Sequence, residues 1–427
     1  MTPIPSPVLR AVPREVINKL WSQRVTRLSL KHLATVGRHV LETKNNTGFL
    51  IPAQFLHQEL PIRFSQTLKM LNSPNIPHNM NKTPTFQRFR EKYYEYICLL
   101  ASSPKPDTLA AEQSFTALIR NIQRQNRLNM LSFGQAFRDV LESTNTPIEA
   151  LDTPETREFF DRFYAMNLGT RILIGEHLAL HDEGRNLVQR ISPLQVAERA
   201  IRDARKTCEK HYKRSAPEVK IVTPSASITT TYIEEHLHRI LFELLKNSLR
   251  ATLEFHHSSP SLPAIKLIIV DGGEDVTIKL SDEGGGIPIS ASEKVWNYVY
   301  SSTPNCPTTT ATQNSEQKVP RIIWRSDEEG IRLEGEAQLK INDYTDMPLI
   351  SYGHGLPVAR LTARYFGGDL SLVSMEGYGT DTYLSLYRDD THLENFPELL
   401  STTTLQTIPN DGLRWLNNDN DGVIINE

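Results

Sequence analysis

The sequence predicts a chain in two parts, a helical first half followed by a mixed α/β second half. A length of 427 residues is more than one hydrophobic core usually serves, which favours two domains. From Pro52 to about Leu180 the apolar residues recur at helical spacing, whereas from Ile265 onwards short β-branched runs alternate with glycine-rich turns. The hydrophobic content of 39% and the charged content of 23% are ordinary for a globular protein.

Composition and charge argue against several classes of protein. The formal net charge of -3 disfavours bulk electrostatic binding to nucleic acid, which needs clustered lysine and arginine. The three cysteines are far apart and lack metal-ligand spacing, so we expect neither a disulfide framework nor a structural zinc site. The longest apolar run, Tyr96 to Ala101, is much shorter than the roughly 20 residues of a membrane-spanning helix.

The N-terminal segment is basic, with Glu15 as the one acid among its first forty residues. Organellar transit peptides share this composition. The favoured interpretation is instead a basic first helix with a buried stripe of Val16, Leu20 and Val25.

The first half is interpreted as a bundle of about four long helices. One predicted helix carries an apolar stripe at helical spacing, formed by Phe115, Leu118, Ile119 and Ile122. Prolines fall between the helical segments, where a missing N–H costs little. The stretch from Gly184 to Pro193 then predicts a hinge into the second domain.

The second half combines helices with two pairs of strands. A new amphipathic helix contains Val196, Ile201, Ala204 and Cys208. The runs Ile265 to Val270 and Val276 to Leu280 predict a hairpin, and Asp369 to Met375 pairs with Thr382 to Tyr387. We expect helices on one face of this sheet. The polar chain beyond Asp390 is expected to be a mobile tail.

One predicted helix, Phe242 to Glu254, has a polar face whose side chains could bind a ligand or take part in a reaction. Four side chains share it at spacings of three, four and seven residues: Glu243, Lys246, Asn247 and Arg250. The competing interpretation is a solvated face whose charges pair with one another. Asn247 weakens that interpretation because asparagine is a poor helix former, while its amide oxygen beside a carboxylate suits magnesium.

Three glycine clusters follow this helix. Asp282, with Gly284, Gly285 and Gly286 behind it, ends a strand at a corner that a flat ligand could approach. The competing interpretation is an ordinary turn before a helix capped by Ser290 to Glu293. Gly353 and Gly355 precede a predicted helix whose first position is Pro357, a junction that offers N–H groups to phosphate. Gly377, Gly379 and Thr380 add a further flexible turn.

The order of these motifs resembles the ATP-binding domain of histidine kinases, gyrase-type ATPases and mitochondrial protein kinases, the GHKL superfamily with its Bergerat fold. Several stretches are closely similar to the mitochondrial pyruvate dehydrogenase kinase and branched-chain ketoacid dehydrogenase kinase family: FLHQELPIRF, FFDRFYAMNLGTRILIGEH, ELLKNSLRAT, YVYSSTP, GHGLPVARLTARYFGGDL and SMEGYGTD. The similarity spans roughly residues 11 to 390.

The resemblance implies an N-terminal four-helix bundle (residues 1–190), a GHKL-type α/β sandwich ATP-binding domain (191–390, with a long lid insertion at 303–351) and a polar tail (391–427). It implies an ATP- and Mg²⁺-dependent serine kinase of the mitochondrial matrix that inactivates a 2-oxoacid dehydrogenase complex, with pyruvate dehydrogenase the favoured target. The dehydrogenase component would be the substrate, and the helical domain would dock on the lipoyl-bearing acyltransferase core. A homo- or heterodimer through the nucleotide domain is expected.

The resemblance also implies roles for individual residues. Glu243 would be the general base, Asn247 the magnesium ligand, and Lys246 and Arg250 neighbours of the phosphates. Asp282 would receive the adenine amino group. The nucleotide and its lid would be lined by Gly284, Gly286, Ser301, Ser302, Gly353, His354, Gly355, Leu356, Gly377, Gly379 and Thr380.

The sequence departs from the family pattern at three places. Arg239 stands one turn before Glu243, where many relatives carry a histidine, and a nearby cation weakens a carboxylate as a base. The lid is longer than usual and is expected to be a surface loop. The tail lacks the usual Asp-Trp ending, with Trp415 as a remnant.

Three alternative functions are also compatible with the sequence. The target could be the branched-chain enzyme. A histidine kinase would need an acceptor histidine on a helix, and the best candidate, His181, is expected in a loop because Gly184 follows it. A non-catalytic, nucleotide-gated adaptor would follow if Arg239 disables the base.

Overall fold

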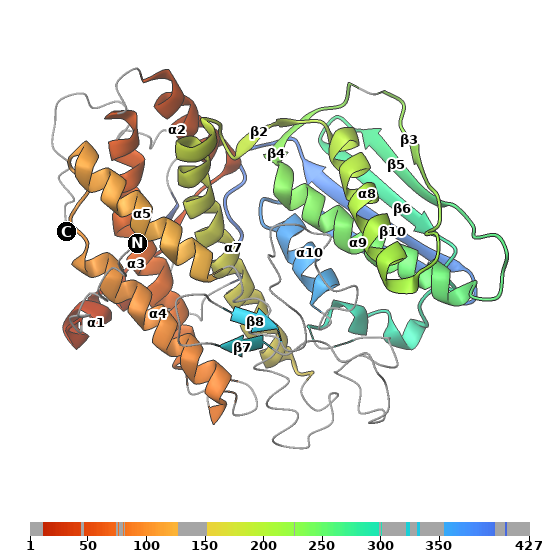
Figure 1. Ribbon diagram of the computed structural model, residues 1–427, viewed down its shortest axis with the longest axis horizontal. Coiled ribbons are helices and arrows are strands. Elements are labelled where there is room, and N and C mark those ends of the chain that lie inside the picture. Colours follow the sequence, from red (N-terminus) through yellow and green to blue (C-terminus); the bar gives the residue numbers. More distant parts are fainter. Residues whose placement is uncertain are drawn as a thin grey trace.

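The structure is a computed structural model that describes residues 12–43, 47–73, 76, 80, 82–126, 152–225, 227–298, 300, 322–324, 331–333, 354–397 and 406–407. A helical part and an α/β part lie side by side, with the long helix α7 next to the α/β part (Figure 1). The described apolar core is continuous from Val25 to Phe396 and runs through both parts.

The helical part is built from long helices with recognisable start and stop signals. Its elements are α1 (Arg14–Ser22), α2 (Leu30–Glu42), the 3₁₀ turn η1 (Thr47–Phe49), α3 (Leu50–Leu71), α4 (Pro84–Ser102), α5 (Leu109–Asn126) and α7 (Pro154–Glu183). The Thr153 side chain caps α7, Pro154 occupies its first turn, and Gly184 ends it in the left-handed conformation at φ 58°. α3 packs against α4, α5 and α7. The expectation of a helical first half is confirmed.

The first helix differs in detail from its prediction. α1 ends at Ser22, so Val25 lies outside it, and Val16 is 39% exposed. Ile17 is the buried apolar residue of α1. The predicted stripe was wrong for Val16, which is exposed. Leu20 packs against the core and Val25 is buried, but Val25 follows the end of the helix.

The α/β part contains a mixed five-stranded sheet. Its strands are β3 (Val219–Val222), β5 (Ile265–Asp271), β6 (Asp275–Asp282), β10 (Gly379–Tyr387) and β9 (Asp369–Met375), in that spatial order. β3 and β5 are parallel, and the other neighbours are antiparallel, as the two predicted hairpins require. The helices α8 (Pro193–Tyr212), α9 (Glu234–Phe255) and α10 (Gly355–Arg364) cover one face (Figure 1), as expected.

The predicted hinge contains a strand. β2 (Val188–Ile191) pairs antiparallel with β4 (Thr230–Ile233) and spans the expected boundary between residues 190 and 191. Its two end residues are buried and the two between them are more accessible, so the burial does not alternate residue by residue as in a regular half-buried strand, and the sequence carried no clear β pattern here.

The lid insertion and the tail both contain short strands. Within the lid insertion, the structure describes β7 (Ile322–Trp324) and β8 (Ile331–Leu333), which form an antiparallel pair where a loop was expected. In the tail, β11 (Gln406–Thr407) pairs parallel with β1 (Thr26–Arg27). Glu394 and Phe396 are buried, so the expectation of a mobile tail was wrong for this segment.

A buried ionic network explains why Glu394 is held. The Arg63 guanidinium of α3 donates to Glu394 Oε2 at 2.7 Å and to Glu59 Oε1 at 3.0 Å. The Tyr365 hydroxyl, at the end of α10, donates to Glu394 Oε1 at 2.9 Å. Burying these charges is tolerable because each has partners. The network links α3, α10 and the segment after β10.

Candidate functional site

The polar face of α9 is buried. The Lys246 ammonium lies 2.8 Å from Glu243 Oε2, and the residues are 2% and 9% exposed. Lys246 also lies over the Phe242 ring, 5.6 Å from its centroid. Asn247 and Arg250 are half-buried on the same face. The interpretation of a solvated face is therefore wrong, because water does not screen this ion pair.

A second carboxylate is tied to the same helix. Ser248 Oγ of α9 donates to Asp282 Oδ2 at 2.6 Å, and the Gly284 N–H donates to Asp282 Oδ1 at 3.0 Å. Burial raises the pKa of Asp282, and the hydrogen bonds from Ser248, Gly284 and Thr380 oppose that rise. A buried carboxyl at the end of β6 is thus fixed in orientation and has capacity to accept a ligand N–H.

The glycines behind Asp282 interlock with a second turn. The Gly285 N–H donates to Tyr378 O at 3.0 Å, and the Gly377 N–H donates to Gly285 O at 2.8 Å. Gly286 has φ +70°, and a Cβ there would lie 2.0 Å from Met375 O. The two clusters, almost a hundred residues apart, are brought together by the pairing of β6 with β10, in which Thr380 stands opposite Asp282.

Glycine also permits the approach to α9. A Cβ on Gly284 would lie 2.6 Å from Ala251 Cβ, and one on Gly379 would lie 1.9 Å from Asp282 O. The turn could not pack against the helix with larger residues. The competing interpretation, a turn before a helix capped by Ser290 to Glu293, was wrong about the helix: among the described residues only the 3₁₀ turns η4 (Ile289–Ala291) and η5 (Lys294–Trp296) follow.

The third cluster begins α10, which packs against α9. The helix starts at Gly355, so Pro357 is its third residue and not its first as predicted. Leu356 is half-buried in the same turn, and no side chain caps this N-terminus in the described structure. Its first N–H groups can therefore bind an anion. Gly353, Ser301 and Ser302 lie outside the described residues.

His354, at the start of α10, contacts the helical part. Tyr164 of α7 hydrogen-bonds through its hydroxyl to His354 Nδ1 at 2.8 Å. The rings of Phe160, Tyr164 and Tyr298 surround the imidazole at centroid distances of 5.6, 5.7 and 5.7 Å. Burial lowers the pKa of His354 to about 3, so the ring is neutral at physiological pH. This link between α7 and the α10 junction was not predicted.

Arg239 acts electrostatically on other residues. Its charge lowers the pKa of Tyr164 and that of His236. Burial has the larger effect on both residues: it raises the pKa of Tyr164 and lowers the pKa of His236. The expected influence of Arg239 on Glu243 as a base stays a prediction.

Sequence reasoning missed Ser248 as a functional residue. It lies in the apolar stripe with Leu237, Leu241 and Leu244, all buried as predicted. A hydroxyl at a buried helical position was the available signal, since such a group needs a partner.

The histidine considered as a phosphate acceptor lies in a helix. His181 is in the last turn of α7, so its placement in a loop was wrong. Its Nε2 atom lies 2.8 Å from Glu112 Oε1 of α5. The imidazole of His181 is therefore held by a contact within the helical part.

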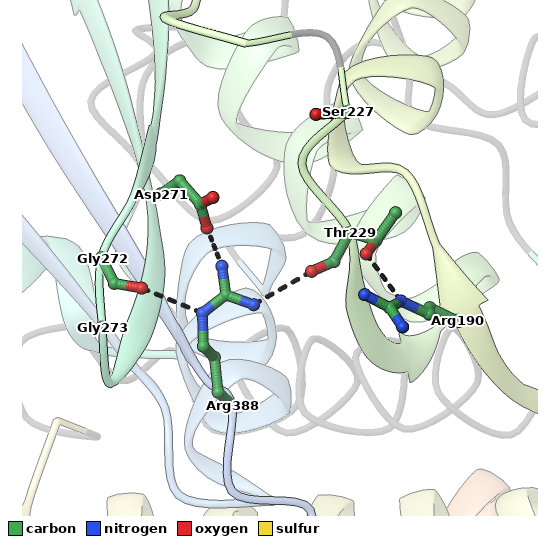
Figure 2. A pocket seen from close by; sticks show the side chains of 7 residues that line it. All are labelled: Arg190, Ser227, Thr229, Asp271, Gly272, Gly273 and Arg388. Carbon is green, nitrogen blue, oxygen red and sulfur yellow. Dashed lines mark hydrogen bonds and ion pairs between the residues drawn. The ribbon is translucent and has the colours of Figure 1, made fainter.

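A pocket of about 330 Å³ lies elsewhere on the α/β part and contains none of the predicted site residues (Figure 2). Arg388 donates there to Gly272 O at 2.9 Å and to Thr229 O at 3.0 Å, and pairs with Asp271. Arg190 donates to Thr229 Oγ1 at 2.7 Å. These contacts tie the β5–β6 turn to the segment before β4, which is a structural role.

The chain was compared with known proteins. Residues 27–210 match the family model of mitochondrial branched-chain alpha-ketoacid dehydrogenase kinase, and residues 232–390 match that of histidine kinase-, DNA gyrase B- and HSP90-like ATPases. No described helix is long and apolar enough to cross a membrane.

Relatives match along most of the chain. The mitochondrial pyruvate dehydrogenase (acetyl-transferring) kinase of Arabidopsis thaliana is 36% identical over 384 residues, which covers 88% of this chain and 93% of the relative. Isozyme 4 of Mus musculus is 30% identical over 392 residues (88% and 84%), and isozyme 1 of Homo sapiens is 28% identical over 400 residues (90% and 79%). The chain therefore belongs to the family of mitochondrial pyruvate dehydrogenase and branched-chain ketoacid dehydrogenase kinases, with a GHKL-type ATPase domain in its second half.

Proposed function

We propose that the protein is an ATP-dependent serine kinase that phosphorylates and thereby inactivates the pyruvate dehydrogenase component of a mitochondrial 2-oxoacid dehydrogenase complex. The observation that carries this is the convergence on α9 of a buried Glu243–Lys246 ion pair and a carboxyl, Asp282, fixed by Ser248. The relatives named as pyruvate dehydrogenase kinases support the choice of substrate.

In this proposal Glu243 takes the proton from the substrate serine as its oxygen attacks the γ-phosphorus of ATP. The bond from that phosphorus to the β–γ bridging oxygen breaks, and ADP leaves. Lys246 and Arg250 neutralise charge on the phosphoryl oxygens, and the N–H groups at the start of α10 receive the phosphates. Asp282 accepts the adenine amino group, while the turns at Gly284, Gly286, Gly377, Gly379 and Thr380 enclose the base.

The half-buried Asn247 fits magnesium, because a hard amide oxygen next to a carboxylate suits an ion that keeps several of its waters. The bound ion would neutralise charge between the phosphates. We expect Asn247→Ala to abolish the gain in ATP affinity that Mg²⁺ gives the wild type. Calorimetry with and without Mg²⁺ tests this, with Asn18→Ala on the exposed side of α1 as the control. An unchanged Mg²⁺ dependence would remove Asn247 from the site.

A cavity in the helical part is our candidate docking place for a lipoyl group. An apolar cavity between α2, α3 and α7 is lined by Leu28, Leu33, Phe55, Leu56, Leu173 and Leu180. Most of its lining is apolar, which is the character that an aliphatic chain ending in a dithiolane requires. We therefore propose docking on the lipoyl-bearing acyltransferase core through residues 1–190, with 191–390 as the kinase domain and 391–427 as the tail.

We also propose a homo- or heterodimer through the sheet. The face of the sheet opposite α8, α9 and α10 carries exposed apolar side chains at Val222, Val270, Val373 and Met375. They lie on β3 and β5 towards one edge of the sheet and on β9 at the other, and exposed apolar side chains of this kind favour a protein interface. A role in the mitochondrial matrix follows from the proposed substrate and from the relatives' mitochondrial names.

The branched-chain dehydrogenase is the second candidate substrate, because the family model that matches residues 27–210 carries that description. Purified protein should be incubated with labelled ATP and each complex separately. We expect label on the serine of the pyruvate dehydrogenase component and loss of that complex's activity. Label confined to the branched-chain complex would overturn the choice, and absence of transfer with intact ATP binding would favour the adaptor.

A further inference from the structure

One carboxylate and two imidazoles meet in the helical part. His177 and His181 are one turn apart on the same face of α7, and Glu112 projects from the first turn of α5. The Nε2 atoms of the two histidines lie 3.3 and 2.8 Å from the same atom, Glu112 Oε1. All three potential ligand atoms lie within 4.8 Å of one another.

This set matches the requirements of a zinc-type ion. Zn²⁺ takes imidazole nitrogen and carboxylate oxygen at about 2.0–2.2 Å, so neighbouring ligands of a tetrahedral shell are about 3.3 Å apart. The His177–Glu112 distance already has this value. Two histidines four residues apart on a helix can bind one ion from one face. The distance from His181 Nε2 to Glu112 Oε1 is shorter, 2.8 Å, and small side-chain rotations would widen it to the value that a bound ion requires.

Burial leaves one approach to the three ligands. The side chains of His177 and Glu112 are 1% and 2% exposed, whereas His181 is 19% exposed. An ion can enter from the His181 side, where a water molecule can complete the fourth position. The Phe49 ring packs on the His181 ring, with their centroids 4.0 Å apart, and restricts its rotation.

A hydroxyl of α5 contacts both of the buried ligands. Thr116 Oγ1 lies 2.8 Å from His177 Nε2. Thr116 Oγ1 donates to Glu112 Oε1 at 2.8 Å, the kind of outer contact that orients a ligating carboxylate.

We propose that Glu112, His177 and His181 bind a divalent transition-metal ion of the Zn²⁺ type, with water as the fourth ligand, and that this ion joins α5 to α7. His177 also lines the apolar cavity between α2, α3 and α7. The ion therefore fixes one wall of that cavity. The expectation against zinc rested on cysteine spacing, which does not bear on a His-x₃-His pair.

The test uses the full chain after removal of metals with EDTA. Calorimetric titration with ZnCl₂ should give one bound equivalent for the wild type and for His257→Gln, a control at an exposed histidine. Glu112→Gln and His181→Gln should each lose affinity by at least about tenfold. Titration with Co²⁺ should give the intense visible bands of tetrahedral coordination in the wild type and weak bands in both variants.

Two outcomes would overturn the proposal. One is a wild type that binds no Zn²⁺ and gives no Co²⁺ bands, which would make the cluster a hydrogen-bonded ion pair only. The other is unchanged binding in Glu112→Gln and His181→Gln, with circular dichroism showing that both are folded. Where one of the two variants fails to fold, the other decides the matter, because each removes a single ligand.

Discussion

Glu243 and Lys246 are residues whose placement costs free energy. Their side chains are 12% and 3% exposed, and removing opposite charges from water offsets most of what their attraction contributes. A pair in such a position gives little stability. It does give an oriented carboxylate and a cation in a region from which water is largely excluded. In the proposed reaction the cation would neutralise phosphoryl charge, and it would also weaken the carboxylate as a base.

We expect Glu243→Gln to retain ATP affinity within a few-fold and to lose about 10²–10⁴ in phosphoryl transfer, because the amide cannot accept the serine proton. Initial rates with the pyruvate dehydrogenase complex and calorimetric ATP binding measure the two quantities. The control is Glu254→Gln, an exposed acid on the same helix that accepts a hydrogen bond from Tyr212. A rate equal to that of the control would assign the base to another residue.

We expect Glu176 of α7 to make the stability of the fold depend on pH. Burial raises its pKa to about 7, against the bonds from the N–H groups of Leu187 and Val188. The folded state then holds a proton that the unfolded state has lost, so the free energy of unfolding falls as pH rises from about 4.5 to 7. Glu176→Gln should remove this penalty.

The expected gain for Glu176→Gln is about 1–3 kcal/mol at pH 8, shrinking towards zero near pH 4.5. Urea unfolding at several pH values measures it. The control is Glu183→Gln, whose exposed carboxylate pairs with Arg185 at the end of α7. A gain that is the same at every pH would contradict the assigned cause.

Among the elements, the two turns that lock β6 to β10 depend on glycine at Gly286. Its φ is +70°, and an added Cβ would lie only 2.0 Å from Met375 O, so the position excludes any side chain. We expect Gly286→Ala to lower the free energy of unfolding by more than about 1 kcal/mol and to weaken ATP binding, because Asp282 lies at the start of the same turn.

Gly273→Ala in the β5–β6 turn is the matched control, since nothing lies within 4 Å of its Cβ position. Thermal unfolding and ATP titration of both variants make the comparison. Equal effects of the two substitutions would show that the turn tolerates a side chain and does not position Asp282.

At the scale of the whole molecule, the network of Arg63 joins the helical part to α10 and to the segment that contains Glu394. We expect Arg63→Met to destabilise the fold by about 3–5 kcal/mol, because it leaves the carboxylates of Glu59 and Glu394 buried without a cation. Chemical denaturation followed by circular dichroism measures the loss.

A control variant and a combined variant accompany that measurement. Arg185→Met removes an exposed partner of Glu183 and should cost less than about 1 kcal/mol. Adding Glu59→Gln and Glu394→Gln to Arg63→Met should restore part of the lost stability, since no unpaired charge then remains. If Arg63→Met is as stable as Arg185→Met, the network does not hold the parts together.

Local sequence patterns were enough to predict the class of the fold and the position of the motifs. Helical periodicity between Pro52 and Leu180, and the β-branched runs around the turns at Asp271 and Gly377, follow from local rules of spacing and turn chemistry. These rules operate over a few residues, so the elements they predicted are present. The family resemblance was likewise carried by short contiguous stretches such as ELLKNSLRAT and SMEGYGTD.

Which groups meet and which are buried depends on how the elements pack together. Ser248 bonds Asp282 across 34 positions, Tyr164 bonds His354 across 190, and Arg63 bonds Glu394 across 331. Spacing along a helix cannot distinguish a solvated Glu243–Lys246 pair from a buried one, because burial depends on what packs above it. Local signals fix the elements, whereas desolvation and long-range pairing, which give the site its chemistry, exist only once the elements have come together.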